Sequence, residues 1–187
     1  WKAEDVSYLF AGDLLGQCIA TSFGISAYNI PLFGVYGACS TCGEALTLGA
    51  VMAAGGYAEH VVCVTSSHFA SAEKEFRFPL DYGSQRPLSA SWTVTGSGAC
   101  VLGKTKSRVK ITGATTGKII DYGLKDNQNM GACMAPAACD TIAQNLVDFN
   151  REQADYDRIV TGDLGVVGRE ILLELLKKKG YDISEQH

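Results

Sequence analysis

Short apolar runs alternate along this chain with longer segments in which apolar residues recur at helical spacing. Runs of the first kind predict strands and those of the second kind predict helices. The run HVVCVT at 60–65 is rich in β-branched residues, which is typical of a strand buried on both faces. The other predicted strands lie within 5–15 and at 32–36, 93–102 and 108–112, and helices are predicted after residue 15 and over 40–54, 134–149 and 172–179.

Two glycines and a proline refine these boundaries. The paired Gly55 and Gly56 end the helix over 40–54, and Pro136 is placed in the first turn of the helix over 134–149, where a missing N–H is tolerated. Because strands alternate with helices, we expect parallel pairing with right-handed crossovers, and therefore an α/β layered sandwich.

One segment near the start of the chain recurs near its end. DVSYLFAGDLL begins at Asp5 and DYDRIVTGDLG begins at Asp155, so the two match at a constant shift of 150 residues. A repeated strand, Gly-Asp turn and helix predicts two similar α/β halves, at 1–105 and 106–187. Because the chain opens at Trp1 on the approach to a strand, we expect it to be a fragment that lacks the start of the first half and the end of the second.

Composition excludes several classes of protein. The net charge is −4 with scattered Lys and Arg, which argues against nucleic acid as a partner. The most apolar window, 45–58, is shorter than the ~20 residues of a membrane span and contains three glycines. Seven cysteines, an odd number, favour free thiols in a reducing compartment such as the cytosol over a disulfide framework.

Cys39 is the candidate reactive residue, because it stands where an apolar strand turns into a helix. A helix N-terminus stabilises a thiolate through its free N–H groups and dipole. Three readings stay open: a nucleophile, half of a C-x-x-C redox or zinc pair with Cys42, or a small buried residue lining a pocket. Zinc needs about four ligands, and Cys133 and Cys139 are too widely spaced to form a second pair.

The three histidines differ in what their positions indicate. His68 follows the predicted buried strand at the edge where α/β sheets bind ligands. His60 begins that strand and therefore lies at its opposite end, and His187 is terminal and carries no prediction.

Three longer runs carry a resemblance to known proteins: VYGACSTCGEALTLGAVMAAGG, RPLSASWTVTGSGACVLG and NMGACMAPAACDTI. Together with the order of elements, they resemble the thiolase-like condensing enzymes and, within that superfamily, the stage V sporulation AD family. The resemblance covers essentially the whole chain. It implies a thiolase-like αβαβα layered sandwich, a homodimer formed through the strand before Cys39, and Cys39 at the family's nucleophile position.

The resemblance also implies a function. Proteins of this kind support the uptake of dipicolinic acid (pyridine-2,6-dicarboxylate), with calcium, into the developing spore. They do so with other proteins of the stage V uptake complex, which implies peripheral association with the cytoplasmic side of the spore inner membrane. The resemblance implies no cofactor. No spacing of carboxylates in the sequence indicates a metal site.

The second repeat argues against an enzyme. The condensing enzymes carry a histidine in the loop after the strand that matches 158–160, whereas this chain reads Thr161-Gly162-Asp163 there. Loss of an oxyanion-hole donor costs about 100 to 1,000-fold in rate. We therefore expect a non-enzymatic binding protein with Cys39, Ser40, His68, Thr161 and Asp163 as ligand residues. The alternative is an active acyltransferase in which His68 serves as base to Cys39.

Overall fold

The computed structural model describes residues 2–14, 18–68 and 86–187. The chain divides into two compact units, which are described separately below. Unit 1 comprises the described residues within 1–74 and 94–112, and unit 2 those within 75–93 and 113–187.

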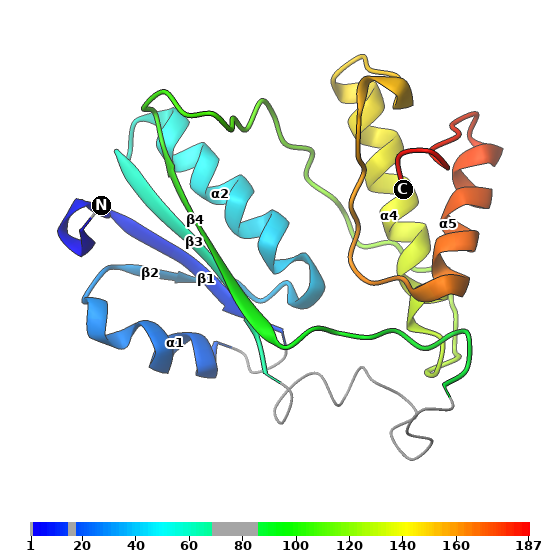
Figure 1. Cartoon of the computed structure of the whole chain (residues 1–187), viewed down its shortest axis with the longest axis horizontal. Helices are drawn as coiled ribbons and strands as arrows, with labels where there is room; N and C mark the ends of the chain where they lie inside the picture. The colour runs from blue at the N-terminus through cyan, green and yellow to red at the C-terminus, as the bar shows by residue number, and fades with distance from the viewer. Residues whose placement is uncertain (1, 15–17, 69–85) are drawn as a thin grey trace. The chain divides into compact units, whose positions relative to one another are not determined.

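Unit 1 is built on a four-stranded sheet of order β2-β1-β3-β4 (Figure 1). β1 (Tyr8–Asp13) pairs in parallel with both β2 (Leu32–Gly34) and β3 (His60–Ser67). β1 is buried over most of its length because a central strand has neighbours on both sides as well as helices on its faces. The parallel pairing predicted from the alternation of strands and helices is therefore confirmed for these three strands.

Two strand predictions are wrong in detail. β4 (Gly96–Gly103) pairs with β3 in the antiparallel direction, because it begins beside the end of β3, with Gly96 opposite Ser67, and runs back along that strand. The segment 108–112 forms no strand, and Val109 in it is 82% exposed. A β-branched segment becomes a strand only where a neighbouring strand takes its hydrogen bonds, and here the chain has left the sheet at Gly103.

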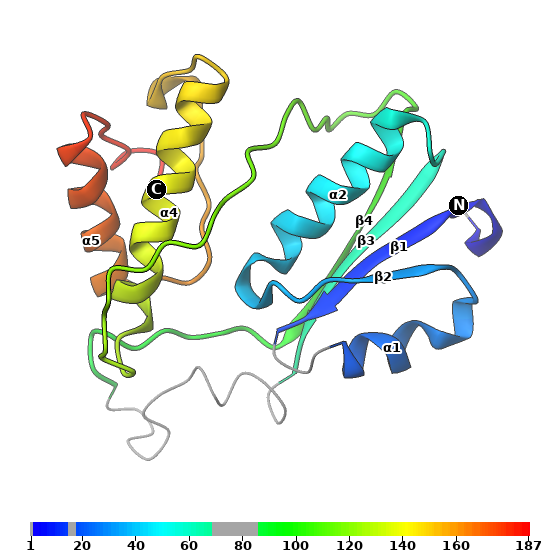
Figure 2. The ribbon, with the colours of Figure 1, turned by 180° about the vertical axis from the view of Figure 1, so that it is seen from behind.

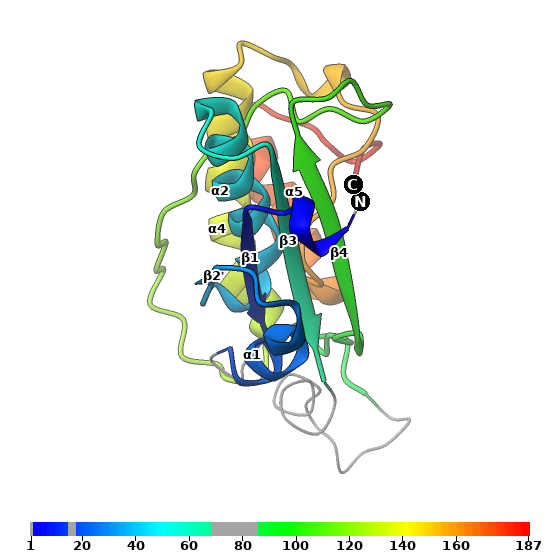
Figure 3. The same ribbon diagram turned by 90° about the vertical axis from the view of Figure 1, so that its left-hand side faces the viewer.

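Helices lie on both faces of the unit 1 sheet. α2 (Thr41–Gly55) covers the face that carries Phe10, Val61 and Cys63, and it ends at Gly56, whose φ of 81° suits glycine. α1 (Ile19–Ile25), followed by the 3₁₀ turn η2 (Ser26–Tyr28), lies against the other face through a contact between Thr21 and Asp13. Figure 3 shows α2 running alongside the strands, with α1 near the ends at which β1 and β3 finish.

Unit 2 is centred on two packed helices, α4 (Met130–Asp148) and α5 (Gly165–Lys178), which lie side by side in Figures 1 and 2. Gly131 and Gly168 meet at their crossing, where a Cβ on Gly168 would come within 2.6 Å of the Gly131 Cα. The buried core of this unit comprises Ala135, Cys139, Ala143, Leu164, Leu172, Leu176 and Ile183.

Both helices of unit 2 begin earlier than their apolar periodicity predicts. α4 starts at Met130, where Asn129 Oδ1 accepts the Ala132 N–H at 3.1 Å, so Pro136 lies inside the helix rather than in its first turn. The proline is buried, and packing offsets the backbone hydrogen bond that it cannot donate. α5 ends as predicted, before Gly180 at φ 90°.

The repeat of 150 residues is visible in local structure. The 3₁₀ turns η1 (Ala3–Asp5) and η5 (Gln153–Asp155) are equivalent, and in each an aspartate carboxylate accepts a backbone N–H three residues earlier at 2.9 Å. The equivalence stops at the next element, because the predicted strand at 158–160 has no ladder partner among the described residues and forms one backbone bond, from Ile159 N to Gln186 O.

Candidate functional site

The candidate residues of unit 1 gather at one edge of its sheet. β1, β2 and β3 are parallel, so their carboxyl ends, at Asp13, Gly34 and Ser67, share this edge. Cys39 follows the end of β2 and His68 follows the end of β3, on either side of β1. This edge is where open α/β sheets bind ligands, which agrees with the prediction for His68.

Cys39 lies in a tight turn that leads into α2. It is the middle residue of η3 (Ala38–Ser40), it is exposed, and Ala38 before it adopts a φ of 47°. Ser40 closes the turn, since its N–H and its hydroxyl each donate to the Gly37 carbonyl at 2.9 Å. The interpretation of Cys39 as a buried residue is therefore wrong, since Cys39 is exposed in the structure.

A glycine and an acidic residue shape the start of α2. A Cβ on Gly37 would come within 2.5 Å of Glu44 Oε2, so only glycine lets this carboxylate lie against the turn. Glu44 is in the first turn of α2, where free N–H groups and the helix dipole favour negative charge. The turn that carries Cys39 therefore already has one carboxylate beside it.

Thr41, the first residue of α2, is buried and close to β1. It is 2% exposed, and its hydroxyl makes no hydrogen bond with any described residue. A Cβ on Gly12 would come within 2.2 Å of the Val35 carbonyl oxygen and 2.8 Å of Thr41 Cγ2, so glycine at position 12 lets the strand and this turn approach closely. The Gly-Asp motif of the first repeat thus contributes directly to the position of the Cys39 turn.

The aspartates of the two Gly-Asp motifs bond to the helices that follow them. Asp13 is 7% exposed, and its Oδ2 accepts the N–H and the hydroxyl of Thr21 at 3.1 and 2.9 Å, while its Oδ1 has no partner among the described residues. Asp163 Oδ1 accepts the Gly165 N–H at 3.0 Å at the start of α5, and its Oδ2 accepts the Trp92 N–H. The motif therefore has a structural role at helix N-termini in both repeats.

Thr161 and Asp163 lie in unit 2, whereas Cys39, Ser40 and His68 lie in unit 1. Both carboxylate oxygens of Asp163 are engaged by backbone N–H groups, which leaves it less available to a ligand than the sequence indicates. Thr161 is half-buried, and its hydroxyl donates to the Gly162 carbonyl at 2.9 Å.

The structure also places an imidazole where the loop sequence lacks one. His187 Nε2 lies 2.9 Å from Thr161 Oγ1, although the two residues are 26 positions apart. The loop Thr161-Gly162-Asp163 contains no histidine, as its sequence shows, but the imidazole of His187 lies next to it. No local pattern identifies this pair, because the contact depends on how the segment after α5 returns to the loop.

None of the seven cysteines forms a disulfide bond. Within the described residues, no group of three or more His, Cys, Asp or Glu side chains is arranged to hold a metal ion. Cys39 and Cys42, the C-x-x-C pair, therefore belong to no such group. Cys63, opposite Cys100 across β3 and β4, is buried, and this burial raises the pKa of its thiol to about 12, with smaller contributions from Cys100 and Cys42.

Comparison with known proteins identifies the family. The sequence model of stage V sporulation protein AD matches residues 1–187 of this chain. The chain belongs to the stage V sporulation protein AD family. The stage V sporulation protein AD of Bacillus subtilis (strain 168) is 45% identical over 184 residues, which cover 98% of this chain and 54% of that protein. The chain therefore spans about half the length of this curated relative.

Solved structures similar to this family member are condensing enzymes. The priming β-ketosynthase of the R1128 polyketide pathway has a TM-score of 0.66 at 16% identity, with 94% of this chain and 58% of that one covered. The 3-oxoacyl-[acyl-carrier-protein] synthase III of Aquifex aeolicus VF5 has a TM-score of 0.63 at 12% identity, covering 99% and 61%. The tetronic acid condensing enzyme AbyA1 has a TM-score of 0.62 at 15% identity, with 97% of this chain and 63% of that one covered. The thiolase-like α/β fold predicted from the sequence is confirmed.

No helix within the described ranges has the length and apolar character needed to cross a membrane.

Proposed function

We propose that this member of the stage V sporulation protein AD family binds dipicolinic acid at the turn that carries Cys39 and Ser40, and thereby supports the calcium-linked uptake of dipicolinic acid into the developing spore. The observation that carries the proposal is the exposed start of α2 at the carboxyl edge of the parallel strands. A helix N-terminus with free N–H groups binds carboxylates, and dipicolinic acid carries two of them on one planar ring.

Two features near this turn support an anionic ligand. The 15 residues of α2 direct a helix dipole with its positive end toward Cys39 and Ser40. The buried hydroxyl of Thr41, which has no hydrogen-bond partner among the described residues, lies in the same first turn. A buried polar group without a partner costs about 1–3 kcal/mol, so a ligand or water that reaches this hydroxyl gains that amount.

The charge of the chain sets a condition on binding. The net charge is −4, and the Glu44 carboxylate lies beside the turn. A dianionic ligand is repelled by both, and calcium carried with the ligand reduces this repulsion. We therefore propose that dipicolinic acid enters together with calcium and that calcium is cargo rather than a resident ion.

The remaining parts of the proposal rest on the family resemblance. His68 at the end of β3, and Thr161 and Asp163 in unit 2, are proposed as further ligand residues. We also propose a homodimer, partners among the other proteins of the stage V uptake complex, and peripheral association with the cytoplasmic side of the spore inner membrane.

An acyltransferase is the second candidate, favoured by the exposure of the Cys39 thiol. In that reaction the Cys39 thiolate attacks the carbonyl carbon of an acyl thioester, an acyl–sulfur bond forms on Cys39, and the carrier thiol leaves. His68 would accept the Cys39 proton.

Calorimetric titration of the protein with dipicolinic acid, with and without calcium, tests the proposal. We expect saturable binding that is stronger with calcium and at least about 10-fold weaker in Cys39→Leu, whose bulk fills the turn without adding charge. Glu44→Gln is the electrostatic variant, and because it removes one negative charge we expect it to tighten binding in the absence of calcium by about two- to fivefold.

The competing outcomes are distinguishable. Mass spectrometry after incubation with an acyl-CoA detects an acyl group on Cys39, and Cys39→Ala is the control for its position. An acyl adduct together with no dipicolinate binding would establish the acyltransferase instead. Binding that is unchanged in Cys39→Leu would remove this turn as the site.

A further inference from the structure

Basic residues are concentrated in one short segment of unit 1. Four of the 16 Lys and Arg residues fall within 104–110, at Lys104, Lys106, Arg108 and Lys110. No acidic residue occurs between Asp81 and Asp121, so all 20 acidic residues lie in other parts of the chain. This basic segment (104–110) is therefore locally positive in a chain whose net charge is −4.

The charges of the basic segment are not neutralised by the residues that the structure describes. All four basic side chains are exposed, and none forms a hydrogen bond or an ion pair with another described residue. Lys104 Nζ lies near the C-terminal end of α2, 3.6 Å from the position of a Cβ on Gly56, where the helix dipole favours a positive charge. Lys106, Arg108 and Lys110 are the three cations that remain for a partner.

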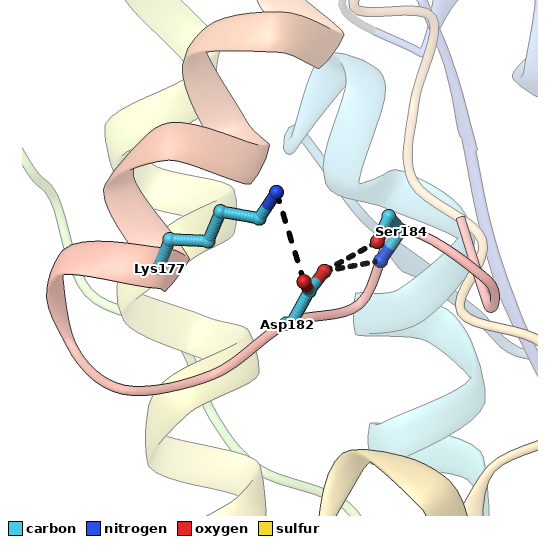
Figure 4. Close-up of polar contacts among 3 residues, drawn as sticks. All are labelled: Lys177, Asp182 and Ser184. Atoms are coloured by element: carbon cyan, nitrogen blue, oxygen red, sulfur yellow. Dashed lines mark hydrogen bonds and ion pairs between the residues drawn. The ribbon is translucent and has the colours of Figure 1, made fainter.

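The lysines at the end of α5 form a contrasting cluster, because a carboxylate balances part of their charge. Lys177 Nζ lies 3.6 Å from Asp182 Oδ2, and Asp182 Oδ1 accepts the Ser184 N–H at 3.1 Å and the Ser184 hydroxyl (Figure 4). The bonds to Ser184, together with Lys177, lower the pKa of Asp182 below its usual value. The Asp182 carboxylate is therefore ionised throughout the neutral range, beside a cluster that also contains Lys178 and Lys179.

Exposed apolar side chains accompany the cations of the basic segment. Val109 is 82% exposed and Ile111 is 46% exposed, and they flank Lys110. Cations and apolar side chains together are typical of a surface that binds a bilayer, where cations meet anionic headgroups and apolar groups enter the boundary of the acyl chains. Binding to nucleic-acid phosphates requires cations and makes no use of exposed aliphatic side chains. The combination therefore favours an anionic lipid surface.

The basic segment and the Cys39 turn lie at opposite ends of the unit 1 sheet. β4 finishes at Gly103, which is opposite His60 at the start of β3, whereas Cys39 follows the end of β2 at the carboxyl edge of the parallel strands. In Figure 3, β4 finishes at the end of the sheet away from α1. β3 has eight residues, and at a rise of about 3.3 Å per residue the two edges are about 25 Å apart.

We propose that the basic segment is the surface by which unit 1 lies on an anionic membrane, with Lys106, Arg108 and Lys110 against the lipid headgroups. The inference rests on the proposed function, which includes peripheral association with the spore inner membrane, and it names the surface and the lipid chemistry. The Cys39 turn, at the opposite edge of the same sheet, faces away from the bilayer and takes its ligand from solution.

Acidic residues near the same edge limit the attraction. Glu59 directly precedes β3. Glu4 and Asp5 belong to η1, which leads to Ser7, whose N–H donates to the His60 carbonyl at 2.9 Å. Each Lys or Arg near an anionic leaflet strengthens binding about fivefold, and a carboxylate at the same distance opposes it. Binding should therefore weaken steeply with salt, which screens both effects.

Co-sedimentation with vesicles tests the inference on this chain. We expect binding to vesicles of equal parts phosphatidylglycerol and phosphatidylcholine, and none to phosphatidylcholine alone. The triple variant of the basic segment, with Lys106, Arg108 and Lys110 each changed to Gln, should bind at least about 50-fold more weakly. The matched control changes Lys177, Lys178 and Lys179 to Gln, which removes the same charge, and it should bind within about threefold of wild type.

Two further variants test the sign of the charge effect and the choice of partner. Glu59→Gln removes a repulsive charge from the same edge and should strengthen vesicle binding about two- to fivefold. Val109→Ser combined with Ile111→Ser should weaken vesicle binding about fivefold, because exposed apolar area no longer enters the bilayer. Duplex DNA is the comparison polyanion, and wild-type protein that binds it in preference to the vesicles would overturn the assignment to lipid.

The outcomes separate this inference from the proposed ligand site. The basic segment is remote from the Cys39 turn, so its triple variant should bind dipicolinate as wild type does in calorimetry. Vesicle binding that is equal in that variant and in wild type, or absent in wild type, overturns the inference whatever calorimetry shows. If wild type binds vesicles but not dipicolinate, the ligand site fails and the membrane surface stands.

Hydrogen exchange in the presence of vesicles tests the orientation. We expect slower exchange at 104–112 at short times and unchanged exchange at 37–44, which contains the Cys39 turn. Slower exchange at 37–44 with none at 104–112 would show that the opposite edge of the sheet faces the bilayer, and would overturn the inference.

Discussion

At the scale of single residues, the environment of each sulfur separates the cysteines into two groups. Cys39, Cys42, Cys100 and Cys133 are exposed, whereas Cys18, Cys63 and Cys139 are buried. Cys63 donates to the Ala45 carbonyl at 3.1 Å, and its raised pKa, about 12, keeps it in the thiol form at any physiological pH. Because the thiolate is the reactive species, burial and a raised pKa both lower the reactivity of Cys63.

We therefore expect iodoacetamide at pH 8 to modify the four exposed cysteines of the folded protein and to leave Cys63 unmodified. Peptide mass spectrometry measures the extent at each position over time. Denatured protein is the control, since all seven thiols should react once the chain is unfolded. Modification of Cys63 at the rate of Cys42 in the folded protein would contradict the burial of β3.

At the scale of elements, two glycines allow α4 and α5 to pack closely. A Cβ on Gly131 would come within 1.9 Å of the Leu164 carbonyl oxygen, and one on Gly168 within 2.6 Å of the Gly131 Cα. Both obstacles are backbone atoms, which cannot move aside as a flexible side chain does. The helices must separate to admit even a methyl group, and Leu172 and Leu176 on α5 would lose packing as they do.

Gly168→Ala should therefore destabilise the protein by at least about 1–3 kcal/mol, in spite of alanine's higher helix propensity. Gly43→Ala in α2 is the matched control, because a Cβ there meets nothing within 4 Å. It should stabilise the protein by about 0.5–1 kcal/mol. Urea denaturation of the two variants measures the contrast, and stabilisation by both would show that helix propensity and not packing governs Gly168.

At the scale of the whole molecule, the residues that the structure describes form two separate hydrophobic cores. One is formed in unit 1 by Phe10, Val35, Ala45, Ala58, Val61 and Cys63. The other, in unit 2, joins α4 and α5 to Leu164 and Ile183. Each unit buries its own apolar residues, so a substitution in one core acts on the unit that contains it.

Leu172→Ala tests this independence. Leu172 is fully buried, and truncation of such a residue costs about 2–5 kcal/mol. Native-state hydrogen exchange should show faster exchange in α4 and α5, while β1 and β3 keep their protection. Val61→Ala is the reciprocal variant in unit 1. An equal loss of protection in both units for either variant would show that the two cores unfold together.

The local pattern of the chain was sufficient for much of the fold. The alternation of apolar strands with helices predicts the parallel set β1, β2 and β3, and Gly55 and Gly56 predict the end of α2. The change from strand to helix around Cys39 places this residue at a helix start, which the structure confirms. The helix boundaries depend on hydrogen bonds and burial within about 15 residues, so a sequence window of that length contains them. The parallel direction of β1, β2 and β3 joins more distant residues, such as Leu9 with Leu32 and Tyr8 with Val61, and it follows from the general rule for strands that alternate with helices.

Other features depend on which distant segment becomes a neighbour. The antiparallel direction of β4, the absence of a strand at 108–112 and the interior position of Pro136 follow from pairing and packing partners that no local window contains. The Asp163 bonds to Trp92 and the imidazole of His187 beside Thr161 join residues 71 and 26 positions apart. Periodicity therefore located the elements and Cys39, while the surroundings of the 161–163 loop arose from contacts that exist only once the chain has folded.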